Sequence, residues 1–249
     1  MGERLQAVSE LVNSWAPDFI ISTGDNNYPN GSAETIDENV GQYFHKYIGS
    51  YQGDYGEGAQ INRFFPTLGN HDWDSDNAQP YFDYFTLPGN ERYYEFTWEF
   101  LHFFAINSDW REPDGIGSSS KQAAWLKEKL AASQKPWKIV YLHTPPYSSG
   151  LHGSNPAVQW PFKEWGATVV LSGHDHLYER LEINGFTYLT NGLGGSPYIY
   201  PFPSVIPGSL VRYNQANGAM KVTASLTKIT FVFINIFGEV IDEYTISKP

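Results

Sequence analysis

The chain has 249 residues, of which 41% are hydrophobic and 16% aromatic, so we expect a packed protein and exclude a disordered one. Its formal net charge of −11 argues against a nucleic-acid-binding surface, because such surfaces depend on Lys and Arg to neutralise phosphates. The absence of cysteine excludes disulfides and thiolate-bound zinc, so any metal ion would be held by oxygen and imidazole ligands.

The length favours one domain covering residues 1–249, since α/β folds of this size often remain undivided. The longest apolar run, 229–237, is interrupted by Thr230 and Asn235 and is shorter than the roughly 20 residues that a bilayer crossing needs. No charged start followed by an apolar core is visible, so the given sequence shows no signal peptide. We expect neither a membrane nor a nucleic-acid partner, and the sequence predicts no oligomeric state.

Helices and strands alternate along most of the chain. Apolar residues at helical spacing predict helices over 3–15, 32–48 and 120–132. Apolar and β-branched runs predict strands over 19–23, 64–68, 93–106, 139–142 and 167–171. The stretch 220–246 is expected to form consecutive antiparallel strands with a turn at 237–239. The segment 73–90 is expected to be a turn-rich wall of a cleft, and 196–213 a lid or flank.

Four polar clusters each follow directly after one of the apolar runs. In α/β sheets, ligands bind beyond the carboxyl ends of the strands, so these clusters predict one shared site. Carboxylate, phenol, amide and imidazole groups together suit transition ions better than calcium, and six side chains are too many for one ion. They suit two bridged ions that clamp the attacking and leaving oxygens of a phosphoryl transfer. The candidate ligands are Asp25, Tyr28, Asn70, His143, His174 and His176.

These clusters also carry a family resemblance. In order and spacing, they resemble four of the five sequence blocks of calcineurin-like metallophosphoesterases, and the Gly-Asp-x-x-Tyr block is similar to that of the purple acid phosphatase branch. The resemblance covers about residues 18 to 180 and implies an α/β fold with two packed mixed β-sheets flanked by helices, an αββα sandwich. The four blocks are Gly24-Asp25-Asn26-Asn27-Tyr28, Gly69-Asn70-His71-Asp72, Val140-Tyr141-Leu142-His143 and Gly173-His174-Asp175-His176.

The resemblance implies a role for each residue. Asp25 would bridge two ions, with Tyr28 and His176 on the first ion. Asn70, His143 and His174 would hold the second. The first ion would be ferric iron, and the second iron, zinc or manganese. Among the catalytic candidates, His71 would face the substrate as a proton donor or phosphate ligand and would be oriented by Asp72. His152 is a further candidate for contact with the phosphate or the leaving group.

One block of the family pattern has no counterpart in the sequence. It is a strand that ends in Asp-x-Gly or Asp-x-His and precedes a helix such as 3–15. We therefore expect the first strand of the sheet to be missing, with open backbone edges beside the gap. The first metal site would keep only Asp25, Tyr28 and His176. The sequence is then either a fragment that starts at an internal methionine or a protein that binds its metals incompletely.

The function expected from this resemblance is that of a dimetal hydrolase, an acid phosphatase that cleaves small phosphate monoesters by in-line attack of a metal-bound hydroxide. Two alternatives stay open. One is a phosphodiesterase or nucleotide hydrolase with the same site, and the other is an inactive truncated scaffold. The resemblance also implies a secreted or periplasmic location. The natural substrate is not predicted, because it depends on loops such as 74–90 and 196–213 that match no motif.

Overall fold

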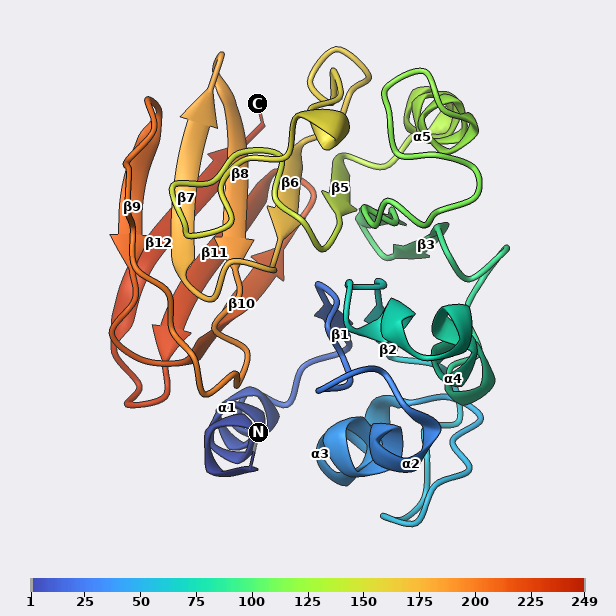
Figure 1. Cartoon of the computed structure of the whole chain (residues 1–249). Coiled ribbons are helices and arrows are strands. Elements are labelled where there is room, and N and C mark those ends of the chain that lie inside the picture. Colours follow the sequence, from blue (N-terminus) through green and yellow to red (C-terminus); the bar gives the residue numbers. More distant parts are fainter. Residues whose placement is uncertain (1, 249) are drawn as a thin grey trace.

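The computed structural model describes residues 2–248, which form two β layers with helices packed around them (Figure 1). The main sheet has seven strands. Its four inner strands, β4, β5, β6 and β8, run parallel, and its outer strands are antiparallel to their neighbours. In spatial order the strands are β3 (Tyr94–Trp98), β4 (Leu101–Ala105), β5 (Trp137–Tyr141), β6 (Val169–Ser172), β8 (Phe186–Asn191), β7 (Tyr178–Ile183) and β9 (Ser209–Tyr213).

The second layer consists of two separate pieces. Strands β1 (Ile20–Ser22) and β2 (Phe64–Pro66) form a parallel pair. Strands β10 (Gly218–Ala224), β11 (Lys228–Asn235) and β12 (Val240–Ser247) form an antiparallel sheet, as the sequence predicted for this stretch. The predicted architecture of two packed mixed sheets flanked by helices is confirmed.

The helices surround these layers. They are α1 (Gly2–Ser14), α2 (Ala33–Ile36), α3 (Gln42–Phe44), α4 (Gln79–Tyr84) and α5 (Lys121–Ala132). The predicted helix over 32–48 is divided into α2, a wider turn at Asp37–Gly41, α3 and a last turn at His45–Tyr47. In residues 2–248, no helix combines the length and the apolar character that crossing a membrane requires.

Two elements differ from the sequence-based expectation. The segment 73–90 contains α4, which is held by the buried Tyr81, whose hydroxyl donates to the Pro66 carbonyl at 2.9 Å. The segment 196–213 ends in β9, which pairs with β7 at the edge of the main sheet. Both elements depend on contacts with distant parts of the chain, so a local pattern does not reveal them.

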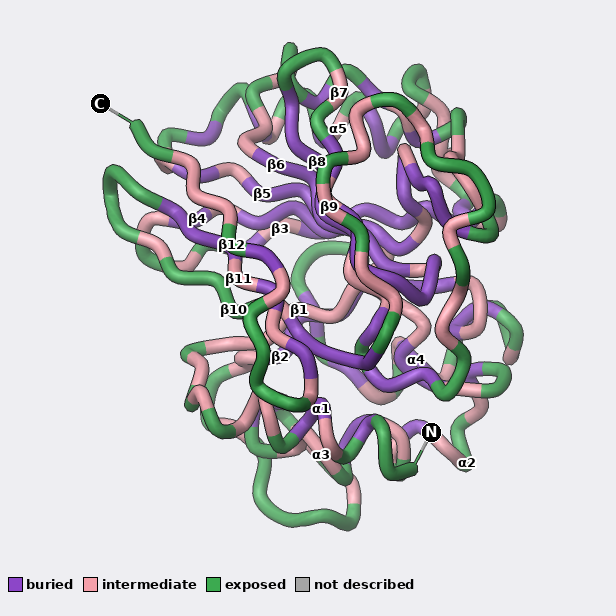
Figure 2. Tube along the Cα trace, turned by 90° about the vertical axis from the view of Figure 1, so that its left-hand side faces the viewer, coloured by how far each residue is buried: buried purple, intermediate pink, exposed green. Residues whose placement is uncertain are grey.

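The core follows from the alternation of side chains along the main sheet. Phe103, Ile139 and Tyr141 face the second layer, whereas Phe104 and Val140 face α5. Strands that are covered on both faces read as continuous apolar runs, which is the pattern found in the sequence. Figure 2 shows the buried trace concentrated in these strands, with the exposed trace in the loops around them.

The second layer has open edges at its centre. Strand β1 pairs only with β2, and β10 pairs only with β11, within the residues that the structure describes. Residues of both strands line one cavity of about 590 Å³ that also contacts α1. Ile21, Met220 and Phe231 contribute apolar walls, and the cavity extends to Asp25 and His143. The expected open backbone edges are therefore present.

Phe103 provides a test of the packing between the layers. Its ring is 3% exposed and lies 4.9 Å from Phe96 and 5.3 Å from Phe19, centroid to centroid. We predict that Phe103→Ala lowers the free energy of unfolding by about 3–5 kcal/mol in urea titrations, because it leaves a buried void. Phe237→Ala, at a ring that is 74% exposed, should change it by less than about 0.5 kcal/mol. Equal values for the two variants would contradict this packing.

Candidate metal centre

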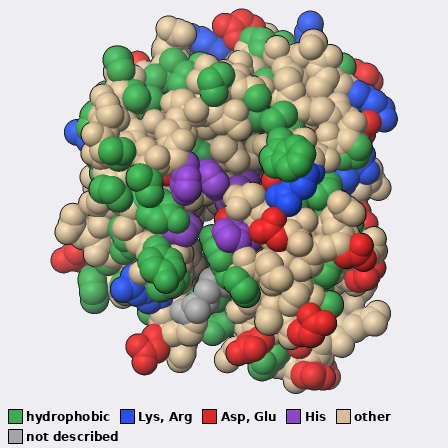
Figure 3. Space-filling model, in the orientation of Figure 1, with side chains coloured by type: hydrophobic (Ala, Val, Ile, Leu, Met, Phe, Trp, Pro, Cys, Tyr) green, Lys and Arg blue, Asp and Glu red, His purple; other side chains and the backbone are tan. Residues whose placement is uncertain are grey.

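The candidate ligands come from four loops that follow strands of both layers. Asp25 and Tyr28 follow β1, Asn70 follows β2, His143 follows β5, and the pair of histidines at 174 and 176 follows β6. Histidine side chains gather in a central hollow of the face shown in Figure 3. The loops therefore meet where the carboxyl ends of the strands open to the surface.

The donor atoms of these side chains form a continuous row. His176 Nε2 lies 3.1 Å from Tyr28 Oη, which lies 3.0 Å from Asp25 Oδ2. The same Asp25 oxygen lies 3.2 Å from His143 Nε2. Asp25 is thus central in the row, in the position expected for a carboxylate shared between two ions.

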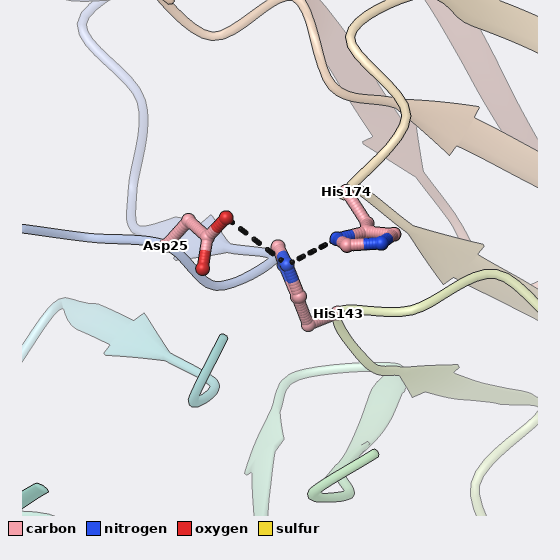
Figure 4. A group of neighbouring side chains, drawn as sticks. All are labelled: Asp25, His143 and His174. Atoms are coloured by element: carbon pink, nitrogen blue, oxygen red, sulfur yellow. Dashed lines mark hydrogen bonds and ion pairs between the residues drawn. The ribbon is translucent and has the colours of Figure 1, made fainter. Parts of the chain in front are cut away.

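Beyond His143 the row divides into two contacts. The Nε2 atom of His143 lies 3.1 Å from Asn70 Oδ1 and 3.0 Å from His174 Nδ1. Ligand atoms of Asp25, His143 and His174 all lie within 4.8 Å of one another (Figure 4). All six predicted ligands therefore converge, and we call them together the donor row: His176, Tyr28, Asp25, His143, Asn70 and His174.

Main-chain carbonyls fix the orientation of two imidazoles in the donor row. His143 Nδ1 donates to Thr23 O at 2.8 Å, and His176 Nδ1 donates to Tyr198 O at 2.9 Å. Each bond uses the nitrogen that faces away from the row and leaves Nε2 directed into it. Metal-binding histidines are commonly held in this way, by a partner on the second ring nitrogen.

The electrostatics of the donor row suit cations. Burial raises the pKa of Asp25, but His143 and, to a lesser extent, His71 together more than offset this, so the pKa falls well below its usual range. Burial, together with the neighbouring His143, lowers the pKa of His174 to about 3, so this ring stays neutral. Burial and the charge of Asp25 raise the pKa of Tyr28. A bound cation would reverse this last effect and displace the proton that Asp25 holds on His143. The resulting carboxylate, phenolate and imidazoles are a donor set that fits transition ions.

The backbone is shaped to bring these loops close together. Asp25 and His174 have φ angles of 53° and 66°, in the left-handed region that non-glycine residues rarely adopt. Gly69 lies so close to Asp25 that a Cβ atom would overlap its amide nitrogen and carboxylate. Such conformations cluster at functional sites, where the surrounding structure compensates for their strain.

His71 lies beside the Tyr28 end of the donor row, with ring centroids 4.4 Å apart. Its Nδ1 atom donates to Pro29 O at 2.5 Å. The expectation that Asp72 orients His71 is wrong: the Asp72 carboxylate accepts from the amides of Asn26 at 3.0 Å and Gly69 at 2.8 Å. Burial, and then the charge of Asp25, raise the pKa of Asp72 to about 6. Asp72 therefore joins two loops of the site, and the Pro29 carbonyl orients His71.

His152 lies beside His174 of the donor row. Its ring centroid is 4.4 Å from that of His174 and 5.3 Å from that of Tyr200. Tyr200 in turn stacks on His176 with centroids 4.3 Å apart and an angle of 14° between the planes. Tyr200 was not predicted from the sequence, because it lies in the irregular segment after residue 195, which matches no motif.

Comparisons with known proteins agree with this geometry. A profile of the calcineurin-like phosphoesterase family matches residues 2–178. The chain is 27% identical over 268 residues to purple acid phosphatase 17 of Arabidopsis thaliana, which covers 93% of this chain and 75% of that relative. It is 37% identical over 89 residues to the Fe(3+)-Zn(2+) purple acid phosphatase 12 of the same plant, which covers 31% of this chain and 19% of that relative.

A solved structure has the same fold. The purple acid phosphatase PPD1 from yellow lupin (Lupinus luteus) seeds superimposes with a TM-score of 0.77 at 19% sequence identity. The superposition covers 98% of this chain and 49% of the lupin chain, so the chain spans about half the length of that protein.

His143 allows a test of ion binding through its proton. Burial lowers its pKa, but Asp25 raises it more, so the folded pKa lies above the ordinary value of 6.5. At pH 6 the ring therefore carries a proton that a bound ion must displace, whereas at higher pH this proton is progressively lost. We predict that Mn²⁺ binding, followed by calorimetry in buffers of different ionisation enthalpy, releases more protons at pH 6 than at pH 9.

The matched control is His152→Ala, which removes an imidazole beside the donor row but outside it. This variant should show the same difference in proton release between the two pH values. Equal release at pH 6 and pH 9 in the unmodified protein would contradict the assignment of His143 as a ligand.

Proposed function

Because the chain belongs to the calcineurin-like phosphoesterase family and to its purple acid phosphatase-like branch, we propose that it hydrolyses phosphate monoesters with two metal ions bound at the donor row. One observation carries the proposal: six side chains from four separate loops bring their donor atoms together in a single row. Packing alone gives no reason for so many metal-binding groups to meet at the ends of strands from both layers.

The donor row suits one ion at each end. Tyr28 and His176 lie on one side of Asp25, and His143 and its neighbours lie on the other. A phenolate ligand favours ferric iron, so we infer iron beside Tyr28 and iron, zinc or manganese at the other end. The relative named as an Fe(3+)-Zn(2+) purple acid phosphatase supports this choice. When bound, such ions supply Lewis-acid stabilisation of the phosphoryl group and an activated nucleophile.

The protein's own contribution comes from the two imidazoles beside the donor row. Since His71 Nδ1 donates to the Pro29 carbonyl, Nε2 is the nitrogen that is free to reach a substrate. In its protonated form, Nε2 can donate to the leaving oxygen as the ester bond breaks in line with the attack. His152, beside His174, is placed to bind a phosphate oxygen.

The direct test is an assay with two aryl esters. The purified chain, supplied with ferric iron and Zn²⁺ or Mn²⁺, is given para-nitrophenyl phosphate and bis(para-nitrophenyl) phosphate. We expect faster turnover of the monoester, and none in Asp25→Asn, which lacks the central carboxylate. Faster turnover of the diester would favour a phosphodiesterase, and no turnover of either ester would favour a non-catalytic scaffold and contradict the proposal.

A second prediction concerns His71. We predict that His71→Ala lowers kcat for the monoester by roughly a hundredfold or more, because general acid catalysis contributes about that much. The metal content, measured by plasma mass spectrometry, should stay the same, since the His71 side chain is outside the donor row. His45→Ala is the control, because His45 Nδ1 bonds the Gly41 carbonyl four residues earlier and the ring is outside the donor row. Unchanged turnover in His71→Ala would remove this residue from the mechanism.

A further inference from the structure

Arg111 contacts the site from the loop that follows β4. Its Nη2 atom donates to the main-chain oxygen of Asn70 at 2.8 Å, and Nη1 donates to Asp74 Oδ1 at 2.9 Å. Its Nε and Nη2 atoms also donate to the two carboxylate oxygens of Asp109, at 2.7 Å and 2.9 Å. The guanidinium group is therefore bonded on three sides by three different residues.

Two of these contacts are made to the segment 70–74, which carries a candidate ligand and the candidate proton donor. Asn70 places its side-chain oxygen in the donor row, 3.1 Å from His143 Nε2. Asp74 Oδ2 lies 3.9 Å from Nδ1 of His71. Arg111 thus holds the backbone of one candidate ligand and the carboxylate beside the candidate proton donor.

The third contact anchors Arg111 to the main sheet. The Asp109 side chain is only 4% exposed, and it also accepts from the Arg111 amide at 2.9 Å. The Asp109 amide donates to Asn107 Oδ1 at 3.1 Å, which fixes the turn at the end of β4. Because this buried carboxylate is itself held in place, it fixes the position of the Arg111 guanidinium group.

The bond from Arg111 to Asp109 is important because the donor row contains side chains from loops of both layers. Asn70 follows β2 in the second layer, whereas His143 and His174 follow β5 and β6 in the main sheet. An ion shared by these three residues requires the two layers to keep a constant separation at this point. Arg111 spans that separation, since it follows β4 of the main sheet and bonds the Asn70–Asp74 segment.

We propose that Arg111 is a positioning residue that locks the segment 70–74 onto the main sheet, so that Asn70 shares an ion with His143 and His174. The same bond to Asp74 keeps His71 in place beside the donor row. The ion-binding part of this inference stands without catalysis, whereas the part that concerns His71 rests on the proposed function.

The geometry requires an arginine. A guanidinium presents five donors in a rigid planar fork, and here it bonds a bidentate carboxylate, a second carboxylate and a carbonyl at once. A lysine ammonium keeps the charge but is a single point on a flexible stem, so it cannot make these contacts together. Arg111→Lys therefore tests the geometry at constant charge.

The alternative is that Arg111 only stabilises the fold through its ion pairs and has no effect on ion binding. Arg180 provides the matched control, because it makes a comparable fork to Asp242, with Nε at 2.7 Å and Nη2 at 3.1 Å. This pair joins β7 to β12, and no hydrogen bond or ion pair within residues 2–248 links Arg180 to the donor row. Arg180→Lys should lower the melting temperature and leave ion binding unchanged.

The experiment compares the two lysine variants with the unmodified chain. Mn²⁺ affinity is measured by calorimetry, melting temperature by circular dichroism, and kcat and KM with para-nitrophenyl phosphate. We expect Arg111→Lys to weaken Mn²⁺ binding by about 10- to 100-fold, as is typical when a group that orients a metal ligand is removed. We also expect kcat to fall by at least about tenfold, with KM within about twofold of the original.

Mn²⁺ affinity of Arg111→Lys within about twofold of Arg180→Lys would overturn the inference, whatever the melting temperatures. If Arg111→Lys does not fold, Asp74→Ala takes its place, because Asp74 is 44% exposed and the loss of its side chain removes one arm of the contact. Weaker Mn²⁺ binding in Asp74→Ala would support the inference, and unchanged binding would overturn it. An unmodified chain that binds Mn²⁺ but lacks phosphatase activity would contradict the proposed function alone.

Discussion

The convergence of metal-binding side chains around one carboxylate oxygen is the constraint on which the site depends. Asp25 Oδ2 lies 3.0 Å from the Tyr28 hydroxyl and 3.2 Å from His143 Nε2, in a largely buried place. Here the Tyr28 hydroxyl and the protonated His143 ring compensate the buried carboxylate, and bound cations would take the place of their protons. The parallel strands, the left-handed backbone at Asp25 and the close approach of Gly69 all serve to bring these side chains together.

Two fully buried carboxylates hold the loops that carry the site. Asp72 accepts from the amides of Asn26 and Gly69, and so joins the loop after β1 to the loop after β2. In the main sheet, Asp175 accepts from Ser148 Oγ at 2.5 Å and from the His152 amide at 2.9 Å, and so joins the loop after β6 to the loop after β5. Arg111 completes this arrangement by linking the two layers. The loops that would bind the ions are therefore already ordered, which lowers the free-energy cost of ion binding.

The sequence predicts the convergence of the candidate ligands well because their signal is local. Each follows an apolar run, and the carboxyl ends of such runs meet in an α/β sheet, so Asp25, Asn70 and His143 could be assigned to one site without coordinates. The rest depends on contacts between distant residues. The role of Asp72 depends on amides 45 and 46 residues away, and Tyr200 reaches His176 from an irregular segment. The same reason explains why β9 and α4 were missed, since pairing and burial define them and periodicity does not.

Anomalous X-ray diffraction from crystals grown with Mn²⁺ is the most direct way to see whether the donor row binds two ions. We expect two anomalous peaks along the row, one beside Tyr28 and His176 and one beside Asn70, His143 and His174, with Asp25 between them. Peaks located elsewhere on the protein, or no peak at the row under saturating Mn²⁺, would contradict it.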